Sequence, residues 1–174
     1  MMNKLFAGVL VGSLFAVFTL QAAPMDTGKN ASGSEGESGK PRNEKTLFNE
    51  GLQFLLEKSF RRAKNKFEDA LSFKENCPEA HNNLAYCLRK LSADNNEEAL
   101  THYNRAIELA PKRPEPYMYR GTLFVLSGQE TRAREDLAKL RELKSALADE
   151  LQWVIENKKE KSAEAYYGVF QKEL

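Results

Sequence analysis

The stretch that decides the fold is residues 78–111, which read PEAHNNLAYCLRKLSADNNEEALTHYNRAIELAP. It contains two runs in which apolar residues recur every three or four positions, as on one face of an α-helix. Between the runs lie the small and polar residues 92–96, SADNN, which favour a turn. Pro78 suits the first turn of a helix, where its missing N–H loses no partner. The stretch therefore predicts two helices, over about 78–91 and 97–109.

The same pattern occurs before and after this stretch. Small residues, alanines and large apolar residues each recur at intervals of 34 or 36 positions: Gly51, Ala85 and Gly121; Ala63, Ala99 and Ala133; Phe67, Tyr103 and Leu137. An insertion of two residues between Ala85 and Ala99 explains why the interval varies. A period of this length indicates stacked units of two helices each. We expect the other helices at 44–58, 59–73, 114–126 and 130–143.

These units resemble tetratricopeptide (TPR) repeats. The second unit matches that family's pattern at His81, Leu84, Ala85, Leu88, Ala99, Tyr103, Ala106 and Pro111, the first at Leu47, Gly51, Phe54, Ala63, Phe67 and Ala70, and the third at Tyr117, Gly121, Phe124, Ala133, Leu137 and Leu140. Glu50 and Arg120 depart from it, because leucine is usual at their position, and Leu140 stands where alanine is usual. The resemblance implies an all-α fold, a right-handed α-solenoid of three helix pairs over 44–147, with repeats at 44–77, 78–113 and 114–147.

The chain continues beyond the third repeat with a further amphipathic segment. Its apolar residues have helical spacing: Leu147, Leu151, Val154 and Ile155. A helix of this kind can cover the exposed apolar face of a last repeat, so we assign residues 148–174 to a capping helix and a tail. The charged run 158–161, KKEK, predicts a frayed helix end. The sequence leaves open whether the aromatic residues of the tail dock on the repeats or bind a partner: Tyr166, Tyr167 and Phe170.

Residues 1–22 have the pattern of a secretory signal peptide. A single basic residue, Lys4, precedes an apolar run, and small residues close the segment at Ala22. The alternative is an uncleaved membrane anchor, which normally needs about 20 apolar residues. Residues 23–43 are rich in glycine and poor in apolar side chains, which predicts a disordered linker. We expect cleavage after Ala22 and a periplasmic protein that makes no further membrane contact.

The composition argues against nucleic-acid binding and against catalysis. Residues 23–174 carry 25 basic and 25 acidic side chains, so the basic excess that neutralises phosphates is missing. His81 occupies a core position, and His102 has no carboxylate or thiol at the spacing of a metal ligand. Cys77 and Cys87 lie too far apart along one helix to form a disulfide. We therefore expect no enzyme activity, no cofactor and no metal site.

In TPR proteins the first helices of the repeats line a concave face on which partners bind. Mapped by the resemblance, this face holds eight candidate partner-binding residues: Phe48, Leu52, Asn82, Asn83, Tyr86, Arg89, Met118 and Tyr119. Some members of the family clamp a C-terminal carboxylate there with lysines, asparagines and an arginine. Only Asn83 of this chain matches that clamp, which argues against a chaperone-tail adaptor. For some apolar residues of the face, packing between helices or under the tail remains an alternative: Leu52, Leu55, Val125 and Leu126.

The sequence thus favours an exported, non-enzymatic interaction module. We expect it to bind an extended or helical segment of a protein or peptide across repeats 1 to 3, with micromolar affinity. An assembly factor that self-associates through its C-terminal helix and aromatic tail is the alternative. A monomer is the favoured oligomeric state, and an accessory subunit of an enzyme is a more distant possibility.

Overall fold

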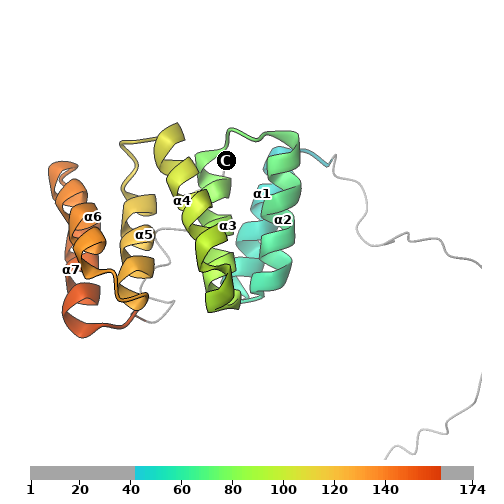
Figure 1. Cartoon of the computed structure of the whole chain (residues 1–174). Coiled ribbons are helices and arrows are strands. Elements are labelled where there is room, and N and C mark those ends of the chain that lie inside the picture. Colours follow the sequence, from blue (N-terminus) through green and yellow to red (C-terminus); the bar gives the residue numbers. More distant parts are fainter. Residues whose placement is uncertain (1–41, 162–174) are drawn as a thin grey trace, which may run out of the picture. The chain divides into compact units, whose positions relative to one another are not determined.

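The computed structural model describes residues 42–161, and within this range it consists of helices and short turns. Figure 1 shows their order: α1 (Glu44–Leu56), α2 (Phe60–Phe73), α3 (Pro78–Leu91), the 3-10 helix η1 (Ala93–Asn95), α4 (Asn96–Leu109), α5 (Pro114–Leu126), α6 (Glu130–Glu142) and α7 (Leu147–Asn157). The predicted signal peptide, all of the predicted linker except its last two residues, and the aromatic tail lie outside the described residues.

The helices form three antiparallel pairs that pack on one another in chain order. Within the repeats α1 packs on α2, α3 on α4 and α5 on α6, while α2·α3 and α4·α5 contacts join neighbouring repeats. The predicted all-α repeat fold is therefore confirmed, and the predicted helices match the observed ones to within two residues at each end. Among the described residues, no helix is both long and apolar enough to cross a membrane.

Local sequence explains where the helices begin and end. Asn43 caps α1 by accepting a hydrogen bond from the backbone N–H of Thr46 (3.0 Å), and Pro78 and Pro114 occupy first helical positions. The turn inside the first repeat uses a left-handed residue, Lys58, and the turn inside the third uses Gly128 at φ 74°.

The second repeat turns differently because of its two extra residues. The longer loop contains η1 in place of a left-handed turn, and two side-chain hydrogen bonds stabilise it. The Ser92 hydroxyl accepts from the backbone N–H of Asp94 (3.2 Å), and the Asn95 amide donates to the carbonyl of Leu88 (3.1 Å). The predicted insertion is therefore accommodated in the loop, and α3 and α4 keep the same pairing as the other repeats.

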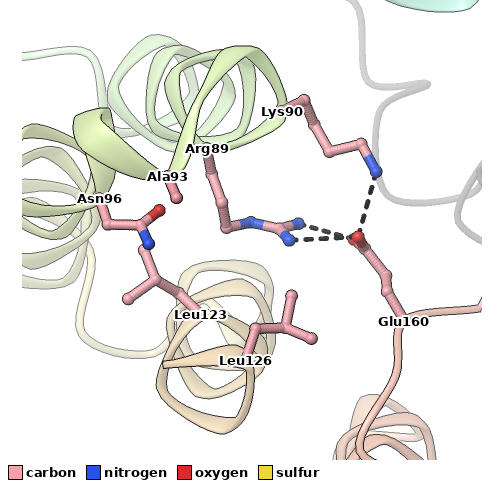
Figure 2. Close-up of a pocket in the computed structure, with 7 residues that line it drawn as sticks. All are labelled: Arg89, Lys90, Ala93, Asn96, Leu123, Leu126 and Glu160. Atoms are coloured by element: carbon pink, nitrogen blue, oxygen red, sulfur yellow. Dashed lines mark hydrogen bonds and ion pairs between the residues drawn. The ribbon is translucent and has the colours of Figure 1, made fainter. Parts of the chain in front are cut away.

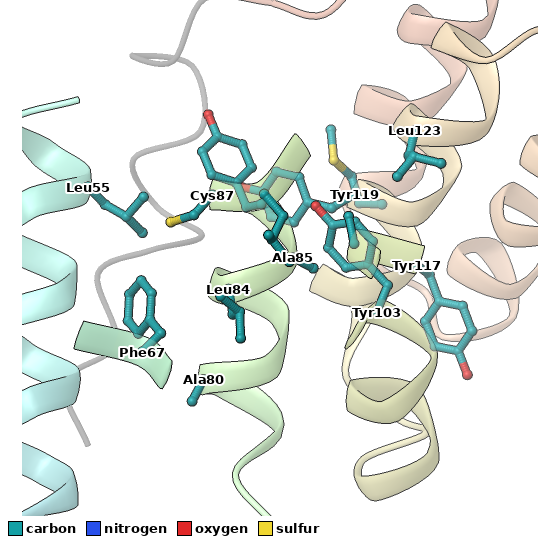
Figure 3. Packing of buried hydrophobic residues seen from close by; sticks show 14 of the residues in the cluster. Leu55, Phe67, Ala80, Leu84, Ala85, Cys87, Tyr103, Tyr117, Tyr119 and Leu123 are labelled. Carbon is teal, nitrogen blue, oxygen red and sulfur yellow. The ribbon is translucent and has the colours of Figure 1, made fainter. Parts of the chain in front are cut away.

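The recurrent small residues let large side chains approach the first helices, and Figure 3 shows the buried side chains around one of them, Ala85. A Cβ atom built on Gly51 would lie 2.6 Å from Cε1 of Phe67, and one built on Gly121 would lie 2.5 Å from Cδ2 of Leu151. Real Cβ atoms do not approach other atoms so closely, so a larger residue at either position would require the side chain of Phe67 or Leu151, or the helix that carries it, to move. In the third repeat the approaching residue comes from α7, which packs on both α5 and α6. The predicted capping helix is confirmed, and its own residues Leu151 and Val154 are fully buried.

The two charged departures from the TPR pattern have one explanation. Arg120 on α5 makes two hydrogen bonds to the buried carboxylate of Asp136 on α6, at 2.6 and 3.1 Å. The Glu50 carboxylate of α1 forms an ion pair with Lys66 of α2. Both pairs join residues 16 positions apart, so each replaces an apolar contact between the two helices of its repeat by a salt bridge.

Candidate functional site

The candidate site is a pocket at the C-terminal ends of α3 and α5. It has a volume of about 270 Å³, and Figure 2 shows the seven side chains that line it: Arg89, Lys90, Ala93, Asn96, Leu123, Leu126 and Glu160. Arg89 and Lys90 belong to the last turn of α3, whereas Leu123 and Leu126 belong to the last turn of α5. The pocket therefore has a cationic side and an apolar side. Leu126 keeps 49% of its surface exposed, which is unusual for so large an apolar residue.

The centre of the pocket is an ion pair between Arg89 and Glu160. The guanidinium donates two hydrogen bonds to the carboxylate, at 3.1 and 2.6 Å, and Lys90 donates a third at 3.2 Å. Only 5% of the Arg89 side chain and 11% of the Glu160 side chain remain exposed, so solvent screens this pair weakly. The ring of Tyr86 lies 5.2 Å from the guanidinium carbon and supports it from the protein side.

The cations control the protonation of Glu160. Burial alone would raise the pKa of this carboxyl, but the hydrogen bonds and charges of Arg89 and Lys90 outweigh burial and hold the pKa below its ordinary value of 4.5. Glu160 is therefore ionised at neutral pH. An arginine held in this way is a receptor for carboxylates, because its planar group offers two parallel donors.

Sequence reasoning missed Glu160. The run KKEK predicts a frayed helix end, but α7 stops at Asn157 and the next residue, Lys158, takes a left-handed conformation at φ 54°. The chain then brings Glu160 to α3, a helix that lies 71 residues earlier in the sequence. No pattern in the sequence signals such a contact, because a single glutamate in a charged run is usually solvated.

The structure places the eight predicted partner-binding residues in two groups. Arg89 lines the pocket, while the other seven are buried, each with at most 7% of its surface exposed: Phe48, Leu52, Asn82, Asn83, Tyr86, Met118 and Tyr119. The Tyr86 ring, for example, packs edge-to-face on Phe60 of α2 (6.1 Å between centroids) and on Tyr119 of α5 (5.3 Å). Partner binding by these seven residues stays a prediction, and Tyr86 also packs between repeats.

Asn82 carries a polar atom without a hydrogen-bond partner among the described residues. Asn82 donates to the side-chain oxygen of Asn83 (3.2 Å), but within residues 42–161 its own Oδ1 is buried without a hydrogen bond. Asn82, Tyr86 and Arg89 follow one another at intervals of four and three residues, so they lie along one face of α3. A buried carbonyl without a donor costs free energy, which a donor from a bound ligand would recover.

The two histidines form a pair that was not predicted. His81 is buried as expected, and its Nδ1 lies 2.9 Å from Nδ1 of His102 on α4. The other nitrogen of His81, Nε2, lies 2.9 Å from the carbonyl oxygen of Glu75 and must carry a proton, since a carbonyl only accepts. His102 therefore donates to His81, and both rings are neutral. Burial lowers the pKa of both, that of His102 to about 4.

The remaining groups offer no second site within the described range. Cys77 and Cys87 are free thiols, as predicted, and both are buried. Residues 42–161 contain no group of three or more histidine, cysteine, aspartate or glutamate side chains that could hold a metal ion. The buried apolar residues of α7 belong to a helix that packs on α5 and α6 of the same chain. The oligomeric state stays a prediction.

The comparisons identify the fold. No family model matches the sequence, and no curated protein matches it. Among solved structures, the type III secretion translocator chaperone SycD of Yersinia enterocolitica superposes with a TM-score of 0.59 at 13% identity, over 66% of this chain and 88% of that one. The first TPR domain of Spaghetti (RPAP3), bound to the HSP90 peptide SRMEEVD, gives 0.59 at 18% identity, over 66% and 92%. PcrH, in complex with the chaperone-binding region of PopD, gives 0.58 at 17% identity, over 65% and 88%. The described part of this chain therefore has the fold of a TPR domain.

Proposed function

We propose that this chain is a non-enzymatic peptide-binding module that acts in the periplasm after export. The observation that carries the proposal is the pocket at Arg89, in which a buried guanidinium stands opposite the apolar side chains of Leu123 and Leu126. A cation beside apolar surface suits a peptide with a carboxylate next to an apolar residue. A pocket with these properties on a repeat scaffold is a recognition surface rather than a reaction centre.

The face of α3 that leads to the pocket supports the same proposal. A bound segment that displaced what covers Asn82 could donate a backbone N–H to its buried Oδ1, the Tyr86 ring supports the guanidinium, and Arg89 contributes the charge. Peptides bind repeat grooves through such mixtures of backbone hydrogen bonds and aromatic contacts. Solved TPR structures of similar fold hold an HSP90 peptide, a peptide of the translocator YopD and the binding region of PopD. We expect a segment that contains acidic and apolar residues, with micromolar affinity.

Export is the second part of the proposal. It rests on the basic start, the apolar run and the small residues at the end of residues 1–22, which lie outside the described range. An exported partner or the exported part of a membrane protein would then be the source of the bound segment.

A peptide-display selection tests the binding proposal. Random peptides are selected on purified residues 23–174 and their affinities are measured by fluorescence anisotropy. The selected peptides should share a carboxylate next to an apolar residue and should lose at least about tenfold in affinity for Arg89→Met. The matched control is Arg134→Met on α6, whose arginine is 58% exposed and pairs, among the described residues, with Glu130 alone. Equal losses in the two variants, or no enrichment of any peptide, would contradict the proposal.

A further inference from the structure

The segment after α7 reaches back across the end of α5 to close the pocket. Four ion pairs hold it: Lys158 with Glu130, Lys161 with Glu150, and Glu160 with both Arg89 and Lys90. The pair of Lys158 with Glu130 lies at the surface, where ion pairs contribute little, and the side chains of Lys161 and Glu150 are 29% and 31% exposed. The pair of Glu160 is shielded from solvent and is the one that joins the segment to the second repeat.

The charges around Glu160 indicate which chemical group the site binds. Arg89 and Lys90 are the two cations of the pocket lining, and Glu160 is its one acidic member. Without a carboxylate, the Arg89 side chain would be a buried charge with no counter-ion, which is strongly unfavourable. The site therefore requires an anionic oxygen pair, but nothing in its geometry requires that this pair belong to Glu160.

The pocket also has room beside the carboxylate. With Glu160 in place, a volume of about 270 Å³ remains between α3 and α5, and it is bordered by Leu123 and the half-exposed Leu126. Glu160 thus fills the charged side of the pocket and leaves the apolar side open (Figure 2). A ligand that supplied both a carboxylate and an apolar side chain would fill both sides.

We infer that Arg89 and Lys90 form a binding site for a peptide carboxylate, and that Glu160 occupies this site in cis until an acidic residue of a partner replaces it. This inference rests on the proposed function and adds a regulatory element to it. The cis segment has the advantage of a high effective concentration, so it excludes weak acidic ligands and yields to a partner that also uses the apolar side. Removing the charge of Glu160 should therefore open the site.

The test uses a small probe in place of the unidentified partner. N-acetyl-glutamate N-methylamide, which presents a glutamate side chain within a peptide-like unit, is titrated into isotope-labelled residues 23–174, and the Nε–Hε signal of Arg89 is followed by NMR. The apparent Kd should be at least about tenfold lower for Glu160→Gln than for the unmodified sequence. Lys158→Gln is the matched control, since it breaks a surface ion pair of the same segment and should leave the apparent Kd unchanged.

Two further arms make the result decisive. The glutamine analogue of the probe should bind neither protein, and Lys90→Gln added to Glu160→Gln should weaken binding of the glutamate probe. Glu160→Asp, which keeps the charge on a shorter side chain, should give an intermediate Kd and serves if Glu160→Gln folds poorly. Equal affinities with and without Glu160, or equal binding of both probes, would overturn the inference. Neither result depends on the peptide-display selection, so failure of the cis ligand and failure of the proposed function can be told apart.

Discussion

Arg89, in the last turn of α3, and Glu160, which follows α7, form two hydrogen bonds of 3.1 and 2.6 Å although 71 residues separate them in the sequence. This contact ties the end of the described chain to the second repeat, whereas α7 itself packs on the third. The repeats, the cap and the pocket are consequently linked, because the residue that closes the pocket stands only three positions beyond the end of the capping helix.

The salt bridge of the third repeat should be sensitive to loss of one partner. Asp136→Ala leaves the Arg120 guanidinium, which is only 21% exposed, without its carboxylate, and we expect the free energy of unfolding to fall by about 3 kcal/mol. Replacing both residues by leucine should restore stability to within about 1 kcal/mol of the original. Urea unfolding measures both. Glu50→Ala is the matched control, because the equivalent ion pair in the first repeat is more exposed and its loss should cost less than about 1 kcal/mol.

The contact between α5 and the cap should appear as coupling between two substitutions. Gly121→Ala places a methyl group against Leu151 and should lower the free energy of unfolding by about 2 kcal/mol. Leu151→Ala should also destabilise, by about 3 kcal/mol, because it leaves a cavity. The double variant should lose clearly less free energy of unfolding than the sum of the two single losses. The methyl group of the Gly121→Ala variant fits into the cavity that Leu151→Ala leaves. Gly51→Ala, which clashes with Phe67 instead, should combine additively with Leu151→Ala. Additive behaviour of the Gly121 pair would show that α7 is not seated on α5 in this way.

The histidine pair should make stability depend on pH. The folded protein depresses both pKa values, that of His102 from 6.5 to about 4, so the unfolded chain binds more protons between these values. The stabilising contribution of the two neutral histidines is therefore fully present above pH 6.5. It is lost progressively as the pH falls toward 4, because protons then bind the unfolded chain more strongly than the folded one. Between pH 7.5 and pH 5 we expect a loss of about 1 to 2 kcal/mol in urea unfolding. His81 and His102 are the only histidines of the sequence, so His102→Gln should remove most of this dependence. An unchanged pH profile in that variant would refute the assignment.

The proposed export signal predicts where the mature protein would begin. If residues 1–22 are removed, N-terminal sequencing of the protein expressed in a Gram-negative host should begin at Ala23, and opening the outer envelope should release it. Chain that begins at Met1 and stays with the membrane would show that the segment is an anchor.

The sequence was sufficient for the fold because the fold depends on a repeated local pattern. The small residues Gly51, Ala85 and Gly121 and the apolar residues recur at intervals of 34 or 36 positions, and this recurrence predicted three helix pairs. The helical spacing of apolar residues after the third pair predicted the cap. The structure contains all of these elements. The pattern could not predict contacts between residues that do not recur at the repeat interval. Arg120 stands in the sequence only as a departure from the usual leucine, and only the packing of α5 on α6 shows that it pairs with the buried carboxylate of Asp136.

The candidate site was predictable only in part, for the same reason. Arg89 could be placed on the inner face of α3 by the repeat, but its carboxylate partner lies in a segment outside the repeats. Tyr86 and Tyr119 were expected on an open face, yet they pack on one another between repeats with centroids 5.3 Å apart. A position in a repeat gives the direction of a side chain, whereas its exposure depends on how closely the next repeat approaches.

The central claim is the proposal that this helical-repeat module, which has the fold of a TPR domain, binds peptides at the pocket between α3 and α5. The most direct measurement is the map of amide chemical-shift changes when a display-selected peptide is added to isotope-labelled residues 23–174. The account predicts the largest changes at the C-terminal ends of α3 and α5 and in residues 158–161, with little change on α2, α4 and α6. Changes concentrated on those second helices, with the Arg89 and Glu160 signals unmoved, would contradict it.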